Sequence, residues 1–553
     1  LPQILMMHQD GKIHVSHFPA DEQKEIKNYE GVDRFKAREL IVADLEKKGY
    51  LEKIEDYQNA VGHCYRCKTI IEPYLSDQWF VKMRELVRPA IQAVEEGRIK
   101  FIPERWTKVY INWMEAHRDW CISRQIWWGH RIPVWYCECG HIIVEESAPE
   151  SCHKCGTKKL TQDPDVLDTW FSSSLWPFST LGWPNETEDL KKYYPTTTLV
   201  TGYDIITFWV SRMIVMGLKF MGKEPFSKIY VHGLIRDITG KKMSKSLGNV
   251  IDPLNVIDRV GADALRFALI TLITGQGQDI KLSEDKITEG RNFSNKIWNA
   301  ARFALNPKSQ IPNPKKTLAD KWILSRFNRA VDRVTGCIED YDIGEAARIL
   351  YEFIWSEFCD WYVEMSKIEA SQKVMIEVFE GTMRLLHPFM PFITEEIWQK
   401  LEGRDEKCET IMLSQWPKSD KRSIDEETEK EMGAIQDIVR AIRNIRATLN
   451  IPHSRELTAN VATAKKIGRD QEKYIKALAR LKELNVVSRI KKIKGTAAAV
   501  LPGINIQVLL EGIVDLAKEI ERLKTKVAGL DDEIAKLKQR IESAKDKKVI
   551  SEQ

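Results

Sequence analysis

The feature that most limits how this chain can fold is a buried-strand pattern followed by a lysine-rich loop and a helix. Residues 228–235, KIYVHGLI, are mostly β-branched, aromatic or aliphatic, as in strands covered on both faces. The loop GKKMSKSLGN follows at 240–249, and GADALRFALITLI at 261–273 has a helical pattern. Strand, loop and helix in this order form the unit of an α/β sheet, where ligands bind at the carboxyl ends of the strands. The sequence therefore predicts a ligand site at the loop.

The loop 240–249 carries three lysines and two serines. A solvated surface loop is the simpler interpretation of that composition. Phosphate binding is the alternative, because mobile ammonium groups can follow a phosphoryl group as charge builds on its oxygens, an effect worth roughly 3 kcal/mol per donor. The order of glycines and lysines is not that of a Walker A loop. The residues around the loop must decide between the two interpretations.

The length and composition set further limits. A chain of 553 residues is too long for one core and predicts three to five domains. With a net charge of only +4, a nucleic-acid partner must be met by local basic patches. The sequence has no run of about eighteen apolar residues and no basic-then-apolar signal segment at its start. We therefore expect a cytoplasmic protein with no membrane partner.

Six of the ten cysteines fall in close pairs. Without a secretory signal, this spacing favours metal over disulfides in a reducing compartment. Two of the pairs, each followed by a glycine, predict a zinc ribbon at 136–160; its ligands are Cys137, Cys139, Cys152 and Cys155. The first pair is Cys-Glu-Cys, one residue shorter than the usual spacing, so His141 or His153 could replace a thiol.

Two later regions have helical patterns. An aromatic and aliphatic stripe in 291–450 predicts core packing rather than a base-stacking platform, and it consists of Tyr351, Ile354, Trp355, Phe358, Tyr362 and Met365. The last region alternates spacings of four and three over nearly four heptads, through Leu516, Ile520, Leu523, Val527, Leu530, Ile534, Leu537 and Ile541. Such a seam needs a partner helix, which the sequence does not supply after it.

Several motifs in one order carry a family resemblance. KMSKS at 242–246, with His-Gly at 232–233 and GYDIITFW at 202–209, resembles the second signature half of a class I aminoacyl-tRNA synthetase. HRDWCISRQIWWGHRIPVWYC, DPDVLDTWFSSSLWPFSTLGWP and CDWYVEMSK resemble the valyl-tRNA synthetase family in particular. The isoleucyl and leucyl enzymes are the close relatives, and TWFSSSLW with the terminal heptads favours the valyl family over both.

The resemblance implies activation of valine by ATP with Mg²⁺ and transfer of the valyl group to tRNA(Val). It implies that Lys242 and Lys245 hold the β- and γ-phosphates and are the catalytic residues. The implied ATP site consists of Gly202, Asp204, His232, Gly233, Lys242, Met243, Ser244, Lys245 and Ser246. His232 and Met243 would lie against the adenine, and Gly202 and Asp204 near the ribose. Asp204 could instead cap the helix that follows it.

The same resemblance assigns other residues. Trp170 and Trp209 would shape the valine pocket, although core packing is an alternative for both. Such a pocket cannot strongly reject threonine, so the full enzyme would need an editing site. Cys64 and Cys67 would bind metal only with an upstream partner pair. Arg440, Arg443 and Arg446 would contact tRNA phosphates along one helix face, or that face is simply solvated.

The implied fold is a partial α/β Rossmann-like class I catalytic domain, then an α-helical anticodon-binding bundle and a C-terminal coiled-coil helix. We expect the remnant of an editing domain at 1–60 and the second half of the catalytic domain at 61–290. An anticodon-binding domain at 291–450, a mixed connecting region at 451–510 and the first arm of a tRNA-binding coiled coil at 511–553 would follow.

None of the eleven histidines forms the His-x-Gly-His signature of class I enzymes. We therefore expect that the chain alone is weakly active or inactive, and that a separate N-terminal half could carry this motif. Three alternatives remain open: a non-catalytic tRNA-binding fragment, an isoleucyl-type synthetase, and a metal-binding structural protein that only looks like a nucleotide-binding protein.

Overall fold

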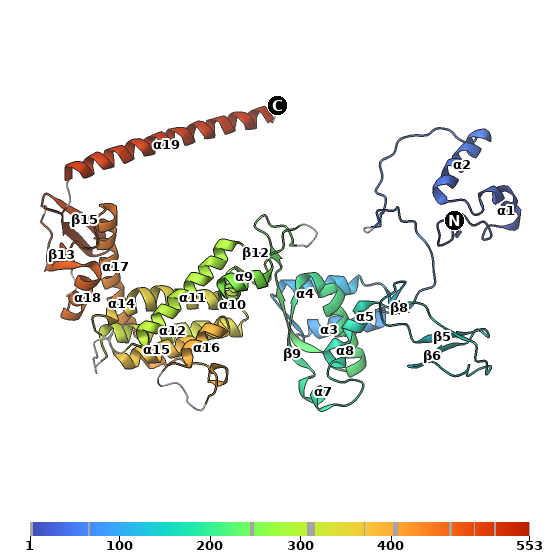
Figure 1. Ribbon diagram of the computed structural model, residues 1–553, viewed down its shortest axis with the longest axis horizontal. Coiled ribbons are helices and arrows are strands. Elements are labelled where there is room, and N and C mark those ends of the chain that lie inside the picture. Colours follow the sequence, from blue (N-terminus) through green and yellow to red (C-terminus); the bar gives the residue numbers. More distant parts are fainter. Residues whose placement is uncertain are drawn as a thin grey trace. The chain divides into compact units, whose positions relative to one another are not determined.

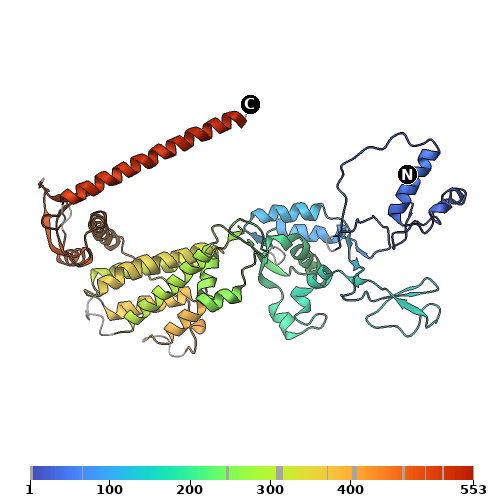
Figure 2. The ribbon, with the colours of Figure 1, turned by 45° about the horizontal axis from the view of Figure 1, so that its top comes forward.

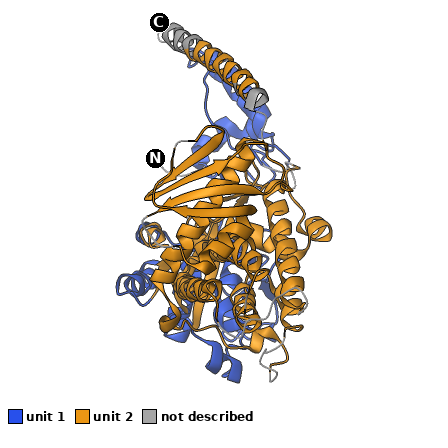
Figure 3. Cartoon of the chain, turned by 90° about the vertical axis from the view of Figure 1, so that its left-hand side faces the viewer, with its two compact units in different colours: residues 1–98, 110–195, 207–225 blue, residues 99–109, 196–206, 226–553 orange. Residues whose placement is uncertain are grey.

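The computed structural model describes residues 4–64, 67–243, 248–306, 316–369, 371–401, 408–463, 467–491, 493–513 and 516–551, and in the last range the side chains of 520–522 and 524–541. The chain divides into two compact units (Figure 3). Unit 1 contains residues 1–98, 110–195 and 207–225, and unit 2 contains residues 99–109, 196–206 and 226–553. Each unit is described by itself.

Unit 1 contains short helices and small sheets. Its helices are α1 (Ala20–Ile26), α2 (Arg34–Lys47), α3 (Arg84–Glu95), α5 (Thr169–Ser174), α6 (Trp176–Ser179), α7 (Glu188–Tyr193) and α8 (Ser211–Met221). Its strands are β1 (Phe80–Val81), β3 (Trp120–Cys121), β4 (Ser123–Arg124), β5 (Val134–Cys137), β6 (Ile142–Val144), β7 (Leu160–Gln162) and β8 (Val166–Leu167). Strands β6, β5 and β7 form an antiparallel sheet that holds the cysteine-rich segment.

Helix α2 follows its local sequence signals. The Asp33 side chain accepts a hydrogen bond from the backbone N–H of Phe35 at 2.9 Å and caps the start of the helix. Gly49, just after the end, has a φ of 71°, which favours glycine. Only Ala37 is buried in this helix, whereas Leu40 and Leu45 are exposed. Among the residues that the structure describes, Leu40 and Leu45 therefore belong to a helix face that is not covered.

The central feature of unit 2 is a parallel sheet of strand order β2-β10-β9. It pairs β2 (Lys100–Ile102), β10 (Phe226–His232) and β9 (Thr196–Gly202), with β10 in the middle. Ile229 and Val231 of β10 are fully buried. The buried strand predicted from residues 228–235 is thus confirmed as far as His232, whereas Ile235 is exposed and belongs to the next strand. The short parallel pair of β11 (Ile235–Arg236) and β12 (Ile280–Lys281) follows beside the lysine loop.

Helices fill the next part of unit 2 and lie side by side in both ribbon views (Figures 1 and 2). They are α9 (Pro253–Val260), α10 (Ala262–Thr271), α11 (Glu284–Ala304), α12 (Leu318–Glu339), α13 (Ile343–Glu352), α14 (Val363–Ser366), α15 (Gln372–Leu386), α16 (Pro391–Trp398) and α17 (Glu426–Thr448). A π-helical segment, Phe353–Tyr362, joins α13 to α14. The predicted stripe packs in this core, with Ile354, Phe358 and Tyr362 almost fully buried.

The region 451–510, for which the sequence analysis assigned only a mixed character, forms a four-stranded sheet of order β14-β13-β16-β15. Its strands are β13 (Leu457–Thr463), β14 (Leu481–Val487), β15 (Thr496–Leu501) and β16 (Ile504–Leu509), and α18 (Arg469–Ala479) lies between β13 and β14 in the chain. Buried residues of β13 and β16 share one core with the helices.

The last helix, α19 (Leu516–Ser551), is a long single helix in both ribbon views (Figures 1 and 2), and near its start Arg522 donates to the carbonyl oxygen of Thr448 at 2.9 Å. Its apolar residues Ile520, Val527 and Leu530 are about half exposed, and the side chains of Leu516 and Leu523 lie outside the described ones. Among the described residues, no helix combines the length and the apolar character needed to cross a membrane.

Candidate active site

The carboxyl ends of β9 and β10 lie side by side because the two strands are parallel and in register. Gly202, the last residue of β9, pairs with His232, the last residue of β10. The Nδ1 atom of His232 lies 2.8 Å from the carbonyl oxygen of Gly233. Because a carbonyl can only accept, Nδ1–H is the donor of this hydrogen bond. Three of the predicted ATP residues, Gly202, His232 and Gly233, thus meet at one sheet edge.

Both glycines at this edge sit where a side chain would collide with a neighbour. A Cβ on Gly233 would lie 1.8 Å from the carbonyl oxygen of Gln278, a backbone atom. A Cβ on Gly202 would lie 2.7 Å from a carboxylate oxygen of Asp204. Glycine is therefore required at 233 for packing, and at 202 it keeps Asp204 in place.

The first lysine of the KMSKS segment is close to the predicted ribose ligand. The Nζ atom of Lys242 lies 3.7 Å from a carboxylate oxygen of Asp204, and both side chains are largely exposed. An exposed pair of this kind contributes little to stability, so both groups remain available to a ligand. Asp204 lies within the short helix Tyr203–Ile205, whose N-cap is Gly202, so the structure does not favour the capping alternative.

Among the other predicted loop residues, Met243 packs against the small core of Val256, Leu265 and Ala268. Ser244, Lys245 and Ser246 lie outside the described residues.

An aspartate that was not among the predicted site residues joins the two described ends of the loop. One Asp237 oxygen accepts hydrogen bonds from the backbone N–H groups of Thr239 and Lys241, each at 2.9 Å. The other accepts from the Asn249 side chain at 2.8 Å. The Asn249 and Thr239 hydrogen bonds are the main reason that the pKa of Asp237 is lowered to about 2. Asp-x-Thr-Gly was a usable turn signal in the sequence.

A second aspartate, Asp279, joins the residues that follow β10 to the residue that follows β9. It accepts a hydrogen bond from the backbone N–H of Leu234 at 2.9 Å and forms an ion pair with Arg236. The hydroxyl of Tyr203 is 3.2 Å from the same carboxylate, and its ring stacks on Trp106 with centroids 5.4 Å apart. No sequence signal singled out Asp279, because its partners come from distant parts of the chain.

The two predicted valine-pocket tryptophans lie on neighbouring helical segments of unit 1. Trp209 donates its indole N–H to the carbonyl oxygen of Ser173 at 3.0 Å, and Ser173 lies on the same helix as Trp170. The rings of Trp170 and Phe208 stack with centroids 6.0 Å apart. Both tryptophans are only partly buried. They are therefore not sealed in a core, and an aromatic surface remains open.

The four ribbon cysteines converge, and their sulfur atoms all lie within 4.8 Å of one another. The Sγ atoms of Cys137 and Cys155 are 3.5 Å apart, and those of Cys139 and Cys152 are 3.7 Å apart. A tetrahedral zinc with bonds near 2.3 Å requires an edge of about 3.8 Å between sulfurs. The four thiols thus fit zinc despite the short Cys-Glu-Cys spacing, and neither His141 nor His153 belongs to this cluster.

The other predicted cysteine pair differs. Among the described residues, neither Cys64 nor Cys67 belongs to a group of three or more side chains that could hold a metal ion. The hydroxyl of Thr69 lies 3.3 Å from the Cys67 sulfur, and this contact leads the effects that lower the pKa of Cys67 to about 7.

Of the three predicted tRNA-binding arginines, two donate hydrogen bonds to backbone carbonyl oxygens. Arg446 is buried and donates to the carbonyl oxygens of Pro452 and Arg455 at 3.1 and 2.7 Å. Arg443 donates to the carbonyl oxygen of Leu478 at 2.9 Å. Arg440 is about half exposed, pairs with Asp437 at 3.2 Å, and has its guanidinium carbon 5.3 Å from the centroid of the Trp361 ring. The geometry therefore leaves Arg440 as the accessible member of the three.

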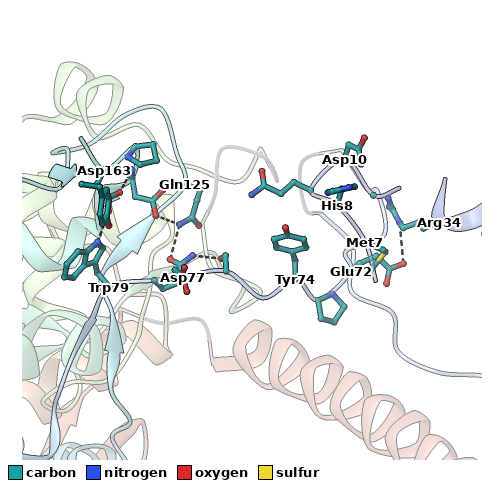
Figure 4. A pocket seen from close by; sticks show the side chains of 18 of the residues that line it. Met7, His8, Asp10, Arg34, Glu72, Tyr74, Asp77, Trp79, Gln125 and Asp163 are labelled. Carbon is teal, nitrogen blue, oxygen red and sulfur yellow. Dashed lines mark hydrogen bonds and ion pairs between the residues drawn. The ribbon is translucent and has the colours of Figure 1, made fainter. Parts of the chain in front are cut away.

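A cavity of about 940 Å³ in unit 1 involves none of the predicted ATP or valine residues (Figure 4). Residues from both the first eighty and the ribbon region line it, including His8, Arg34, Glu72, Trp79 and Asp163. Trp79 and Tyr136 donate hydrogen bonds to Asp163 at 2.8 and 2.6 Å, so this carboxylate is already engaged in holding the ribbon.

Comparison with known proteins identifies the class. Residues 10–283 match the family described as tRNA synthetases class I (I, L, M and V), and residues 320–462 match the anticodon-binding domain of tRNA ligase. The chain belongs to the class I tRNA synthetases.

Curated relatives narrow this class. The valine--tRNA ligase of Thermotoga maritima is 52% identical over 524 residues, which cover 93% of this chain and 60% of that protein. The enzymes of Carboxydothermus hydrogenoformans and Symbiobacterium thermophilum are both 48% identical, and the matches cover 98% and 93% of this chain and 62% and 60% of those proteins. The chain is a member of the valine--tRNA ligase family and spans about three fifths of the length of these relatives.

Proposed function

We propose that the chain contributes to a valine--tRNA ligase reaction, in which ATP activates valine and the valyl group passes to tRNA(Val). The observation that carries the proposal is the sheet edge: Gly202 paired with His232, and Lys242 3.7 Å from Asp204. These are the positions where the family resemblance expects ATP, and the chain is 52% identical to a valine--tRNA ligase.

In the proposed reaction, the valine carboxylate attacks the α-phosphate of ATP and pyrophosphate leaves. No enzymic nucleophile is needed, so positioning and charge stabilisation carry the catalysis. Lys242 and Lys245 would hold the β- and γ-phosphates of Mg²⁺-bound ATP. Lys242 pairs with Asp204; in the proposed complex with ATP, Lys242 would turn to phosphate and Asp204 to the ribose hydroxyls.

The remaining ATP contacts follow from the sheet edge. Gly202 and Gly233 would allow the nucleotide to approach the backbone, and Ser244 and Ser246 would add hydroxyl donors. His232 would lie against the adenine with Met243, whose packing on Val256 and Leu265 would fix that end of the loop.

Trp170 and Trp209 would form the wall of the valine pocket. Two contacts support this role: Trp209 donates to the Ser173 carbonyl oxygen, and Trp170 stacks on Phe208. Each tryptophan is also only partly buried. Such a wall rejects isoleucine by overlap but discriminates threonine by only about a hundredfold. Residues 1–60 would therefore belong to the editing domain of the full enzyme.

Cys137, Cys139, Cys152 and Cys155 would hold a structural zinc ion that fixes the ribbon at 136–160, which their donor spacing supports. Zinc would supply no chemistry to the proposed reaction.

The C-terminal part would bind tRNA. Residues 291–450 would form the anticodon-binding domain, 451–510 would connect it onward, and 511–553 would supply the first arm of a coiled coil. Arg440 is the arginine best placed for phosphate contact. The exposed seam of Val527, Leu530 and Ile534 on α19 supports packing of this helix against a partner helix.

The test is valine-dependent exchange of pyrophosphate into ATP by the 553-residue chain, alone and with a polypeptide that carries the His-x-Gly-His region of a relative. We expect little exchange alone and a clear rise with the added polypeptide, because the sequence has no His-x-Gly-His. ATP binding that never supports exchange with valine would refute the proposal.

A second candidate function is a tRNA-binding fragment without catalysis, favoured by the same missing motif. It predicts tRNA binding by the chain with no ATP binding. Isoleucine-dependent exchange would instead indicate the isoleucyl-type alternative.

A further inference from the structure

We propose that His8, His14 and Glu30 form a second metal site, for a divalent ion of the zinc type. Their donor atoms all lie within 4.8 Å of one another, and the group is separate from the four ribbon cysteines. This site does not depend on the proposed function.

A turn of the chain places the two histidines on one face. Met7 and Ile13 form an antiparallel bridge, and the backbone N–H groups of His8 and His14 donate to the carbonyl oxygens of Lys12 and Met6 at 2.9 and 3.0 Å. In this register residues 6, 8, 12 and 14 point to the same side. The two imidazole rings accordingly lie with centroids 3.8 Å apart.

Glu30 is brought to the same place by a separate segment. The backbone N–H of Ile13 donates to Val32 at 2.8 Å, and that of Gly31 donates to Ile13 at 2.9 Å. One Glu30 oxygen accepts the backbone N–H of Val15 at 2.7 Å, and the other lies 3.1 Å from Nδ1 of His14. The backbone hydrogen bond therefore aims the second oxygen at the imidazole.

The contacts of His14 suit metal binding. Its Nε2 atom is hydrogen-bonded to the Ser16 hydroxyl, a group that can either donate or accept. Without metal, Nδ1–H can donate to Glu30 while Ser16 donates to Nε2. With metal, Nδ1 can give its lone pair to the ion while Nε2–H donates to Ser16, the outer contact that metal-binding histidines usually make.

The donor set selects the ion. Two imidazoles and one carboxylate suit zinc better than Mg²⁺ or Ca²⁺, which prefer oxygen ligands alone. Tetrahedral zinc with bonds near 2.0–2.1 Å requires donors about 3.4 Å apart, so small side-chain rotations can close the cluster. His8 is exposed and His14 partly so, which leaves room for a fourth ligand, either water or His17, whose ring centroid is 5.2 Å from that of His14.

The experiment is equilibrium dialysis of the full chain against Zn²⁺, with bound metal counted by mass spectrometry. The wild type should bind two ions per chain, one at the cysteines and one at this cluster. Glu30→Gln and His8→Gln should weaken the second site by at least about tenfold and leave the first unchanged. His63→Ala is the matched control, since His63 is an exposed histidine of the same unit outside the cluster.

A Cys152→Ser variant separates the two sites. In that background Co²⁺ should still bind at one site and give a spectrum of nitrogen and oxygen ligands without thiolate bands, and His14→Ala should abolish it. Far-ultraviolet circular dichroism must match the parent, so that loss of folding is not mistaken for loss of a ligand. Metal binding by the wild type that Glu30→Gln and His8→Gln leave unaffected, or binding in the Cys152→Ser background that survives His14→Ala, would overturn the proposal.

Discussion

The helical core and the carboxyl edge of the β2-β10-β9 sheet, both in unit 2, are built by different physical means. The core consists of side chains removed from water, such as Trp398, Phe293 and Tyr362, all at most 2% exposed. The sheet edge consists of exposed or half-buried groups held by carboxylates, Asp237 and Asp279, and by a glycine, Gly233, that meets backbone. The contrast teaches that substitutions in the core should lower stability, whereas those at the edge should mainly lower activity.

The largest expected effect is in the core. Trp398→Ala removes a fully buried ring and leaves Glu380 without the indole N–H that it accepts at 2.7 Å. It should lower the free energy of unfolding by about 3–5 kcal/mol, as other large-to-small core substitutions do. Urea unfolding measures this. Phe392→Ala, on the same helix but 65% exposed, is the control and should cost far less.

Lys242→Ala should have nearly the opposite effect: it should lower activity and leave stability almost unchanged. We expect a loss of roughly 3 kcal/mol of transition-state stabilisation, about a hundredfold in the rate of valine-dependent pyrophosphate exchange, with almost unchanged urea unfolding. The assay uses whichever preparation supports exchange, the chain alone or supplemented. Lys241→Ala, the exposed neighbour, should keep most activity. Equal losses in the two variants would mean that only the net charge of the loop matters.

Gly233→Ala tests whether a residue at the sheet edge can also matter for stability, as residues of the core do. Its Cβ would lie 1.8 Å from a backbone oxygen, so strands or loop must shift. We expect a cost of about 1–3 kcal/mol in unfolding free energy, together with weaker ATP binding measured by calorimetry. Gly336→Ala, in a helix with open space around the glycine, should be neutral or slightly stabilising. If Gly233→Ala changed neither the unfolding free energy nor ATP binding, the backbone at this edge would be able to shift at little cost.

The smallest effect is expected for Asp237→Asn. The affinity for ATP should fall roughly twofold to fivefold, the range for one ordinary hydrogen bond. The pKa of Asp237 is lowered to about 2, so its stabilising contribution is complete above its ordinary pKa near 4 and is lost only as the pH falls towards 2. The ratio of the two affinities should therefore stay constant from pH 7 to pH 4. If this ratio changed between pH 7 and pH 4, a titrating group other than Asp237 would be responsible for the effect on ATP affinity.

The same contrast explains what the sequence could predict. Strand β10 was predictable because a run such as Ile229 to Val231 must be buried, and the glycines and lysines of the edge were predictable because the motifs name them. Asp279 was not, because its partners Leu234 and Arg236 are more than forty residues away in sequence. The burial of Arg446 was not predictable for a related reason. The carbonyl oxygens that it contacts, between residues 452 and 480, reach it only through the tertiary fold.

The small sheet at 457–509 was missed although a signal existed. Pro502 and Gly503 separate two alternating runs, which is a hairpin pattern, and β15 and β16 indeed pair across that turn. The short, alanine-rich strand β15 weakened the pattern. The π-helical segment Phe353–Tyr362 had no sequence signal of its own, since apolar residues at helical spacing predict an ordinary helix equally well.

The position of β10 has a consequence for how the protein is made. It is the middle strand of the sheet, yet it is the last of the three to leave the ribosome, 124 residues after Ile102 and 24 after Gly202, since it begins at Phe226 and ends at His232. Strands β2 and β9 have no partner in this sheet until then. Unpaired strand edges invite wrong association, so a nascent chain paused before residue 226 is where a chaperone would matter most.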